Sequence, residues 1–449
     1  MMKSFRRRLA LLAPLAAVGL GACNNLLSVD NPGKLNDPYL NDPVLIDAMV
    51  NTGAAAFHGE FDNLVFAGAI LGDEAVNSHN FEQWKRIDLR LIEADNSIIN
   101  SDIYQPLQAA RFAADSLAGR VKQVYGDTIN TKGRLAVSRL KVFGGYSYVM
   151  LGEYFCQAPI NLSAGLPSDS LLNRAIVDFA EAITFAKAAR GATIGTTTAD
   201  SLIALSTIGT ARAYLQLGNK AKAIEFATQV TSGQVFNGSF EYRIGYSENT
   251  SLPNDFLFSA NTGSSRYMGV DASFRGLKVG TANDIRVRHT ATAQPAHNAT
   301  TVIFSPYLAP SHGGFDPAAA ITAQTFQKST SIRLASTLEA QYIVAEAQGP
   351  TPATLTFVNQ RRAYGANNAA GTDVALAGDA LVAELRDQRR RDFFLDGHRL
   401  GDLRRYKAQY NVDQFPSGAH PNVDWGSYGT ATCFVPTLAE QIGNPNYKP

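Results

Sequence analysis

The chain is long but poor in cysteine and tryptophan: its 449 residues include only three cysteines and two tryptophans. Three cysteines are too few for the disulfide framework of a small secreted domain, so a large hydrophobic core must hold a chain of this length. Neither sign of charge is in excess, with 40 Lys and Arg against 39 Asp and Glu. This balance gives no electrostatic case for nucleic acid as a partner.

Sequence motifs of enzymes and metal sites are also missing. We find no nucleophile elbow, no H-E-x-x-H, no phosphate-binding P-loop and no glycine-rich dinucleotide fingerprint. The seven histidines show no metal-ligand spacing. We therefore predict no catalytic residue, no cofactor and no metal site. The neighbouring acids Asp73 and Glu74 could serve a glycosidase in principle, but sequence cannot show the separation that such a mechanism requires.

The N-terminus has the features of an exported protein. Lys3 and three arginines precede the apolar residues 9–20, a run too short to span a bilayer permanently. The run leads into Leu20-Gly21-Ala22-Cys23, which resembles the lipobox of bacterial lipoproteins. We predict a signal peptide over residues 1–22, a lipid anchor on Cys23 and a polar tether over residues 23–42. The alternative is an ordinary signal peptide with an incidental cysteine.

The body of the chain, with 45% hydrophobic residues, is predicted to be globular and mainly helical. A first helix is expected over residues 43–58, ending at Gly59. Two later stretches share a small–Tyr–Gly spacing that resembles a tetratricopeptide (TPR) helix hairpin, in which small residues let two helices approach. These residues are Gly145, Tyr148 and Gly152, and Ala211, Tyr214 and Gly218. We expect hairpins over residues 134–190, with the second helix starting at 174, over 202–232 and over 332–363.

Helical periodicity fades between residues 233 and 328, where Gly, Ser, Asn, Thr and aromatic residues dominate. We predict a loop-rich insertion here, with short strands at 256–259 and 301–304. Loops that pack on a rigid scaffold are common places for binding sites.

Residues 379–407 are predicted to form a helix, a break at Gly397 and a second helix. Carboxylates alternate here with arginines: Asp392, Asp396 and Asp402 with Arg390, Arg391, Arg399 and Arg404. One interpretation is a solvated helix face. We favour a buried ion network, because charges beside so many apolar residues are tolerated inside a protein only when they are paired.

This C-terminal part resembles SusD-like (SusD/RagB) lipoproteins. Residues 386–406 match the C-terminal signature of that family, except that its first acid is Asp rather than Glu. The matching residues are Asp396, Gly397, Arg399, Asp402, Leu403 and Arg405. Residues 331–349 are similar to a second family helix through Arg333, Glu339, Tyr342, Ala345, Glu346 and Ala347. Residues 433–447 are similar to its closing segment.

The resemblance implies a mainly α fold: TPR-like helical hairpins form a scaffold, with long irregular loops and a few short strands, in a single domain over residues 43–449. It also implies a surface-exposed outer-membrane lipoprotein that binds a nutrient, an oligosaccharide or in some branches a peptide. The partner would be a SusC-like TonB-dependent transporter. The alternatives are a lipid-anchored glycan or peptide hydrolase and a TPR-type scaffold without a small ligand.

Sugars present apolar C–H faces and rings of hydroxyls, so a sugar-binding surface combines exposed aromatic rings with polar side chains. Residues 73–86 fit this description. The candidate ligand contacts are Trp84, Phe81, Asn77 and Asn80, with Tyr307 from the insertion. Tyr246, Tyr267, Trp425 and Tyr428 are weaker candidates. The competing interpretation is that these rings belong to the core.

Once Cys23 is assigned to lipid, Cys156 and Cys433 remain. They could form a disulfide outside the cytoplasm or remain as two partly buried thiols, since sequence alone does not give the distance between them.

Overall fold

The computed structural model describes residues 41–191, 196–248, 252–261, 266–298 and 302–448. The predicted signal peptide, Cys23 and nearly all of the tether lie outside the described residues. The chain divides into two units, residues 1–45 and 46–449. Of the first unit only residues 41–45 are described, and they include the short 3-10 helix η2 (Pro43–Leu45). Among those residues, no helix combines the length and the apolar character needed to cross a membrane.

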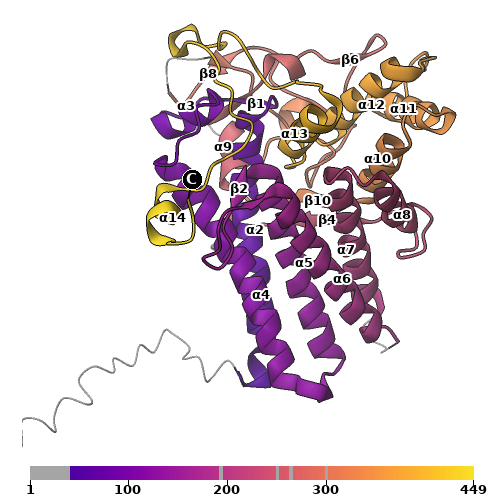
Figure 1. The fold of residues 1–449 in the computed structure, drawn as a ribbon. Helices are drawn as coiled ribbons and strands as arrows, with labels where there is room; N and C mark the ends of the chain where they lie inside the picture. Colours follow the sequence, from indigo (N-terminus) through magenta and orange to yellow (C-terminus); the bar gives the residue numbers. More distant parts are fainter. Residues whose placement is uncertain (1–40, 192–195, 249–251, 262–265, 299–301, 449) are drawn as a thin grey trace, which may run out of the picture. The chain divides into compact units, whose positions relative to one another are not determined.

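Long helices that follow one another in the chain form the scaffold (Figure 1). They are α2 (Ile46–Leu71), α4 (Gln105–Tyr125), α5 (Thr131–Tyr154), α6 (Ser168–Ala189), α7 (Thr196–Gln216) and α8 (Lys220–Thr231). Each consecutive pair from α4 to α8 packs together, and α2 packs against α4 and α5. Side chains cap α5 and α8: Asn130 accepts from Gly133 N at 2.9 Å and Asn219 from Lys222 N at 3.1 Å.

The predicted helix hairpins are present and depend on small residues. They are the pairs α5–α6, α7–α8 and α10 (Thr337–Gln348)–α11 (Pro352–Gly365). A Cβ added to Gly145 of α5 or to Gly209 of α7 would lie within 2.5 Å of the ring of Phe179 on α6. These two glycines therefore let α5 and α7 pack closely against the aromatic side chain of α6. Helix α6 begins at Ser168, earlier than the predicted residue 174, because Leu171 and Leu172 already belong to its buried face.

The first helix is longer than predicted. Helix α2 runs through Gly59 and ends at Leu71, since the apolar stretch after Gly59 packs into the core, with Phe61, Leu64 and Phe66 fully buried. A Cβ on Gly59 would lie 3.1 Å from Leu252. Gly59 is therefore a site of close packing and not a helix stop.

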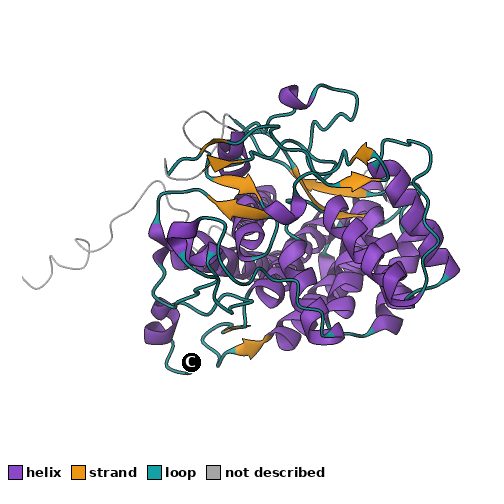
Figure 2. Cartoon of the chain, turned by 90° about the horizontal axis from the view of Figure 1, so that it is seen from above, coloured by secondary structure: helices purple, strands orange, loops and turns teal. Residues whose placement is uncertain are grey.

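The insertion after α8 consists of loops joined by short elements, which Figure 2 shows as small strands and helices. These are β4 (Glu241–Ile244), α9 (Asp255–Asn261), β5 (Met268–Val270), η5 (Ala272–Phe274), β6 (Lys278–Val279), β7 (Ala282–Asn283), β8 (Gln294–Pro295), β9 (Val302–Ile303) and η6 (Ile321–Ala323). The strand predicted at 256–259 is wrong: this segment is α9. Asp62 accepts hydrogen bonds from the backbone N–H groups of Asp255 and Phe256, at 3.0 and 3.4 Å, which caps α9.

The third hairpin also begins differently. Residues Ile332–Ser336 form strand β10, which pairs antiparallel with β4, so the prediction of a helix from residue 332 is wrong for its first residues. All five side chains of β10 are buried. Helix α10 starts only at Thr337, where Ser336 Oγ accepts from Glu339 N at 3.2 Å.

The C-terminal segment forms α12 (Gly378–Asp392), a break and α13 (Arg399–Tyr410), as predicted. Gly397 lies in the break with a φ of 84°, a left-handed conformation that glycine adopts freely. The remaining chain contains two short helices, η7 (Val423–Trp425) and α14 (Leu438–Gly443).

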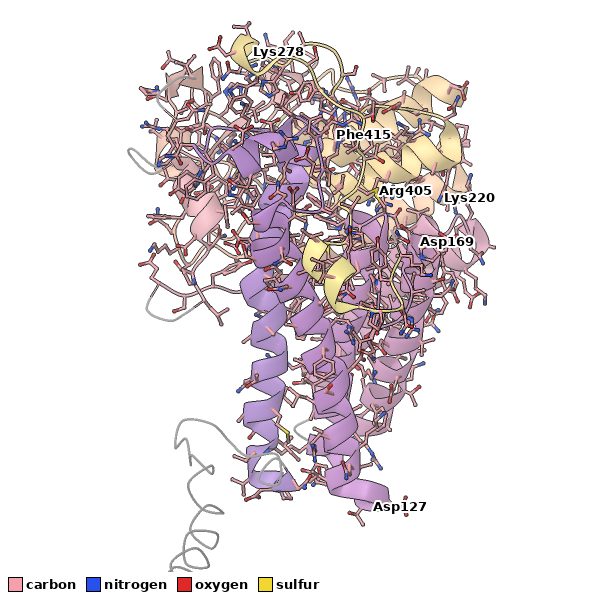
Figure 3. The ribbon with its side chains drawn as sticks, turned by 60° about the vertical axis from the view of Figure 1, so that its left-hand side comes forward. Asp127, Asp169, Lys220, Lys278, Arg405 and Phe415 are labelled. Atoms are coloured by element: carbon pink, nitrogen blue, oxygen red, sulfur yellow. A yellow bond between two sulfur atoms is a disulfide. The ribbon has the colours of Figure 1, made fainter. Side chains whose placement is uncertain are left out.

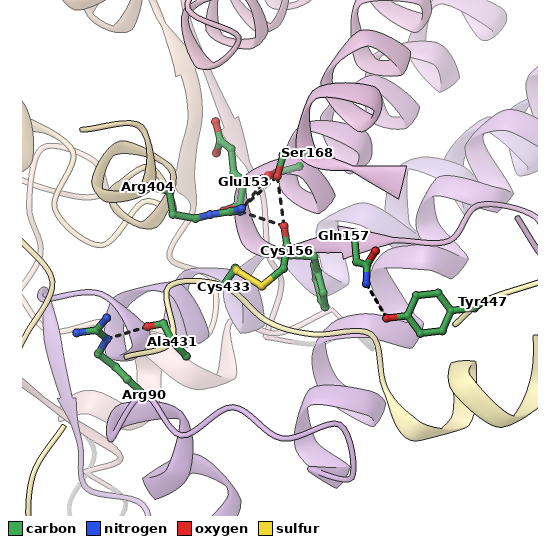
Figure 4. The surroundings of a disulfide bond; sticks show 11 residues. Arg90, Glu153, Cys156, Gln157, Ser168, Arg404, Ala431, Cys433 and Tyr447 are labelled. Carbon is green, nitrogen blue, oxygen red and sulfur yellow. Dashed lines mark hydrogen bonds between the residues drawn. A yellow bond between two sulfur atoms is a disulfide. The ribbon is translucent and has the colours of Figure 1, made fainter. Parts of the chain in front are cut away.

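Cys156 and Cys433 form a disulfide across a sequence separation of 277 residues, which answers the question that the sequence left open (Figure 4). Beside it, Cys156 N donates to Phe434 O at 2.9 Å. Arg404 donates to the carbonyls of Gly152, Glu153 and Phe155, where α5 ends. The prediction that Arg404 pairs with a carboxylate is therefore wrong: it neutralises the negative end of a helix dipole. Burial lowers the pKa of Arg404 to about 10.

Candidate binding surface

The predicted ligand-contact stretch lies where strand β1 (Ala75–Asn77) passes into helix α3 (Glu82–Asp88). Strand β1 pairs antiparallel with β5, so that Asn77 lies opposite Met268. The turn between β1 and α3 leaves Asn80 exposed and the side chain of Phe81 51% exposed. Of the predicted contacts, these two lie on the surface.

Trp84 is a core residue, which corrects its prediction as a ligand contact. Its side chain is 1% exposed, because it lies on the face of α3 that packs on α2. The indole ring is 4.7 Å from the ring of Phe66 and 5.5 Å from that of Phe256, in edge-to-face contacts. No ring face is left for a sugar.

Asn77 and Tyr307 are also buried, at 2% and 9% exposed. Asn77 Oδ1 accepts from His79 N at 2.9 Å, and Asn77 N donates to Asp88 Oδ2 at 2.7 Å. Tyr307 N donates to Arg288 O at 2.9 Å. The prediction of these two side chains as exposed ligand contacts is therefore corrected. Asn77 stabilises the turn between β1 and α3, and Tyr307 is a buried residue of the insertion.

Phe81 belongs to a group of four packed rings, which we call the His79 cluster: His79, Phe81, Tyr267 and His297. The ring of His79 lies 4.3 Å from Phe81, 4.2 Å from Tyr267 and 5.1 Å from His297. Burial and the neighbouring His297 lower the pKa of His79 to about 4. His79 is therefore uncharged at neutral pH, and its Nδ1 accepts a hydrogen bond from Phe81 N at 3.2 Å. The cluster fixes Phe81 in place while leaving half of it exposed.

A hollow of about 270 Å³ opens between β1, β9 and the loop around residue 422. It is linked to the cluster through Asn77, which lines the hollow and whose Oδ1 accepts from His79 N. Its floor includes Asn77, and its rim carries two strongly exposed apolar side chains, Val302 (71%) and Val423 (87%). His420, Pro421, Asn422 and Asp424 complete the lining on the loop side. The hollow thus combines apolar patches with hydrogen-bonding groups.

Trp425 lies on the same loop. His420 stacks on its ring at 4.8 Å, and Lys85 of α3 lies 5.6 Å from the ring centre. His420 Nε2 is 3.3 Å from Asp88 Oδ1. The C-terminal loop is therefore attached to α3 and forms one wall of the candidate surface.

Tyr267 and Trp425 are only weak candidates in the sequence, and nothing in it singles out His297 or His420. His297 and His420 lie far from residue 81 in sequence, and only the folded chain brings them to α3. A signal in the sequence existed only for the segment around Phe81, where aromatic and amide side chains are neighbours.

The signature residues of the C-terminal segment lie in a buried ion network, which confirms that interpretation over a solvated helix face. Arg399 donates to both oxygens of Asp73 at 2.6 and 2.7 Å. Arg405, labelled in Figure 3, donates to both oxygens of Glu346 at 2.8 and 2.9 Å. Other pairs are Arg405–Asp402, Arg389–Asp402 and Arg333–Asp396, and Gly397 O accepts from Tyr154.

Burial alone would raise the pKa of Asp402, but Arg389 and Arg405 outweigh it and hold that pKa below its usual value. The network joins α10, α12 and α13 to the segment in front of β1. It therefore ties the strand that carries the candidate surface to the scaffold. Arg390 lies at the edge of the network, where it pairs with Asp387 in a partly exposed position.

Asp73 and Glu74, the acid pair considered for a glycosidase, are both part of this buried region. Asp73 forms an ion pair with Arg399, and Glu74 Oε1 accepts a hydrogen bond from Leu395 N at 2.8 Å. Burial raises the pKa of Glu74 well above its usual value. A glycan cannot reach this pair without unfolding the network. Among the described residues, no three His, Cys, Asp or Glu side chains are grouped to hold a metal ion.

No protein-family model and no curated protein sequence matches the chain. Several solved structures are similar to the chain. A SusD-like carbohydrate-binding protein from Bacteroides fragilis superposes with a TM-score of 0.65 at 13% identity, covering 92% of this chain and 100% of that chain. A SusD superfamily protein from Bacteroides vulgatus gives 0.65 at 13%, covering 91% and 99%.

A third similar structure is surface glycan-binding protein A from Bacteroides thetaiotaomicron in complex with laminarihexaose. It gives a TM-score of 0.61 at 12% identity and covers 89% of this chain and 97% of that chain. Each of the three superpositions covers 89–92% of this chain. The chain therefore has the SusD-like fold.

Proposed function

We propose that the protein is a cell-surface receptor that binds an oligosaccharide and delivers it to a SusC-like TonB-dependent transporter of the outer membrane. Two findings support this proposal. The fold is that of proteins described as carbohydrate-binding, one of them in complex with laminarihexaose. The surface around Phe81 has the chemistry that a sugar requires.

The observation that carries the proposal is the exposed ring of Phe81, held by the His79 cluster, together with the hollow of mixed apolar and polar lining that Asn77 connects to this cluster. An aromatic face packs on the C–H face of a pyranose, and amide and carboxylate side chains bind its hydroxyls. Asn80, Asn422 and Asp424 supply such groups. Lys85 is paired with Glu82 at 3.2 Å and His79 is uncharged at neutral pH, so the surface favours a neutral ligand.

The same chemistry admits a peptide as a ligand, since aromatic and amide side chains also bind peptide groups. A neutral oligosaccharide is favoured because the candidate surface combines the flat ring of Phe81 with the amide groups of Asn80 and Asn422. A lipid-anchored hydrolase is the second candidate, and the burial of Asp73 and Glu74 removes the acid pair that favoured it. The TPR-type scaffold without a small ligand remains as the third.

Anchoring and domain limits belong to the proposal as well. The signal peptide over residues 1–22, the lipid on Cys23 and the tether over 23–42 would hold a single domain, residues 43–449, at the outer membrane. Changing Cys23→Ala should release the protein from membranes; continued membrane attachment would reject the lipid anchor. Affinity purification from native membranes should co-isolate a β-barrel transporter.

The ligand is tested by incubating the purified full chain with a panel of neutral and acidic oligosaccharides and peptides. Saturable binding to a glycan with no change in its chain length supports the receptor. Shortened products would favour the hydrolase. Absence of binding to every glycan and peptide, with co-purification of a protein, would favour the scaffold.

A further inference from the structure

The C-terminal wall of the candidate surface is a loop that we call the tail loop, residues 416–431. It is folded back on itself: His420 N donates to Gly426 O at 2.8 Å, and Tyr428 N to Gly418 O at 2.9 Å. Its tip carries the residues that line the hollow and the ring of Trp425. Where this tip lies depends on how the two ends of the loop are held.

Arg90 holds both ends. Its Nη1 donates to Pro416 O, and its Nε donates to Ala431 O at 2.8 Å (Figure 4). The guanidinium group lies over the ring of Phe415, 4.8 Å from its centre, and the residue is 5% exposed. A planar guanidinium is suited to this task, because its rigid fork can donate to two acceptors at once.

The backbone of Arg90 points to a constraint beyond packing. Arg90 follows the end of α3 with a φ of 57°, in the left-handed position where glycine is common because other residues are strained there. Its N–H donates to Ile87 O at 2.9 Å, which completes the end of the helix. A strained non-glycine residue persists only where the surrounding contacts hold it in place, as the contacts of Arg90 do.

The backbone next to Arg90 adds to this attachment. Gly429 N donates to Leu89 O at 2.7 Å, and a Cβ on Gly429 would lie 2.6 Å from Arg90 O. At the tip, His420 lies against Asp88, whose other oxygen accepts from Asn77 N. The end of α3 therefore holds the tail loop at two levels: Arg90 at its base and Asp88 at its tip.

We propose that Arg90 is a positioning residue for ligand binding: by joining Pro416 to Ala431 it sets the tail loop, and with it His420 and Trp425, at the distance from Phe81 that the ligand requires. The proposal rests on the proposed function. Arg90 itself does not contact the ligand. Removing the Arg90 side chain should leave the ring of Phe81 in place and shift the tail loop.

The chain offers a matched control in Arg288. Its guanidinium also donates to two carbonyls, those of Asp316 and Pro317, and lies 5.0 Å from the centre of a phenylalanine ring, Phe315. It is 7% exposed. Arg90→Gln and Arg288→Gln thus remove the same kind of contact, but only the first is attached to the tail loop. Arg90→Lys is a second variant that keeps the charge and loses the fork.

Trp425 reports the position of the loop directly. The chain has two tryptophans, so Trp84→Phe leaves Trp425 as the only one. In that background, the full chain is measured for acrylamide quenching of Trp425 and for the Kd of the glycan that binds the wild type best. Thermal melting of each variant separates a local change from unfolding.

We expect Arg90→Gln to raise the quenching of Trp425 about twofold and to weaken glycan binding about tenfold, with Arg90→Lys in between. Arg90→Gln and Arg288→Gln should lower the melting temperature by similar amounts. Arg288→Gln should leave the quenching of Trp425 and the Kd for the glycan within about twofold of the wild-type values. The inference is overturned if Arg90→Gln binds the glycan with the wild-type Kd, or if Arg90→Gln and Arg288→Gln lose the same glycan affinity. Either result leaves the proposed function standing. If the wild type binds no glycan, the proposed function fails and the binding role of Arg90 fails with it.

Discussion

Arg399 and Asp73 form a two-point ion pair across 326 residues of sequence, with N–O distances of 2.6 and 2.7 Å. Both groups are buried. Arg399 opens helix α13, and Asp73 lies just before strand β1. This one pair therefore connects the charged C-terminal segment to the strand that leads to the candidate binding surface.

Removing one partner of this pair should be costly. Asp73→Ala leaves the guanidinium of Arg399 buried without a counter-ion, and we expect a loss of about 3–5 kcal/mol in the free energy of unfolding. Chemical denaturation measures it. The double variant Asp73→Leu with Arg399→Met removes both charges and should recover much of that loss. A loss of less than about 1 kcal/mol in the free energy of unfolding of Asp73→Ala would contradict the role of the pair.

The disulfide closes a loop of 277 residues, so its removal should release much conformational freedom in the unfolded chain. Changing Cys156 and Cys433 together to Ser should lower the free energy of unfolding by about 3–5 kcal/mol. The comparison is made by denaturation under oxidising and reducing conditions. The double variant should be insensitive to reductant, and an unchanged wild-type midpoint in reductant would argue against the bond.

Phe81 and Trp84 lie three residues apart and should respond in opposite ways. Phe81→Ala removes a half-exposed ring and should weaken ligand binding about tenfold with little loss of stability. Trp84→Ala empties a core position and should cost about 3–5 kcal/mol of stability. Calorimetric titration and thermal melting of both variants test the contrast. Equal effects of the two changes on binding would remove Phe81 from the site.

His312 should make stability depend on pH. It is fully buried, its Nδ1 accepts from Ala309 N and its Nε2 donates to Leu395 O, and burial lowers its pKa to about 4. The unfolded chain takes up the proton near pH 6.5 and the folded chain only near 4. The stabilising contribution of the neutral His312 is therefore present above about pH 6.5 and is lost as pH falls towards 4.

The variant His312→Asn isolates this effect. The stability difference between wild type and variant should shrink by about 1.4 kcal/mol for each pH unit between 6.5 and 4. Urea denaturation at pH 7, 6 and 5 measures the difference. A difference that stays constant over this range would mean that His312 is not held neutral.

Much of the scaffold was predictable from local pattern. The spacing of Gly145 and Tyr148, and the alternation of acids and arginines around Gly397, correspond directly to helix packing and to ion pairing. Errors arose where a distant contact overrode the local signal. Judged by local sequence alone, Gly59 would end the first helix, but the apolar residues after it extend α2. Residues 256–259 look like a strand, but Asp62 caps them as helix α9.

The candidate surface was less predictable for the same reason. Phe81 and Trp84 look alike in sequence, and which ring is exposed depends on the face that α3 presents to α2. His297 and His420 reach the surface only through the insertion and the tail loop. The pairing of Cys156 with Cys433 likewise depends on the path of the whole C-terminal chain.

The central claim is that the surface around Phe81 binds an oligosaccharide without cleaving it. Isothermal titration of the purified full chain with a glycan panel that includes laminarihexaose tests this most directly, with Phe81→Ala measured in parallel. The account predicts saturable binding of at least one glycan, recovery of that glycan intact, and an affinity about tenfold weaker in Phe81→Ala. Binding that is unchanged in Phe81→Ala, cleavage of the glycan, or no binding to any member of the panel would contradict it.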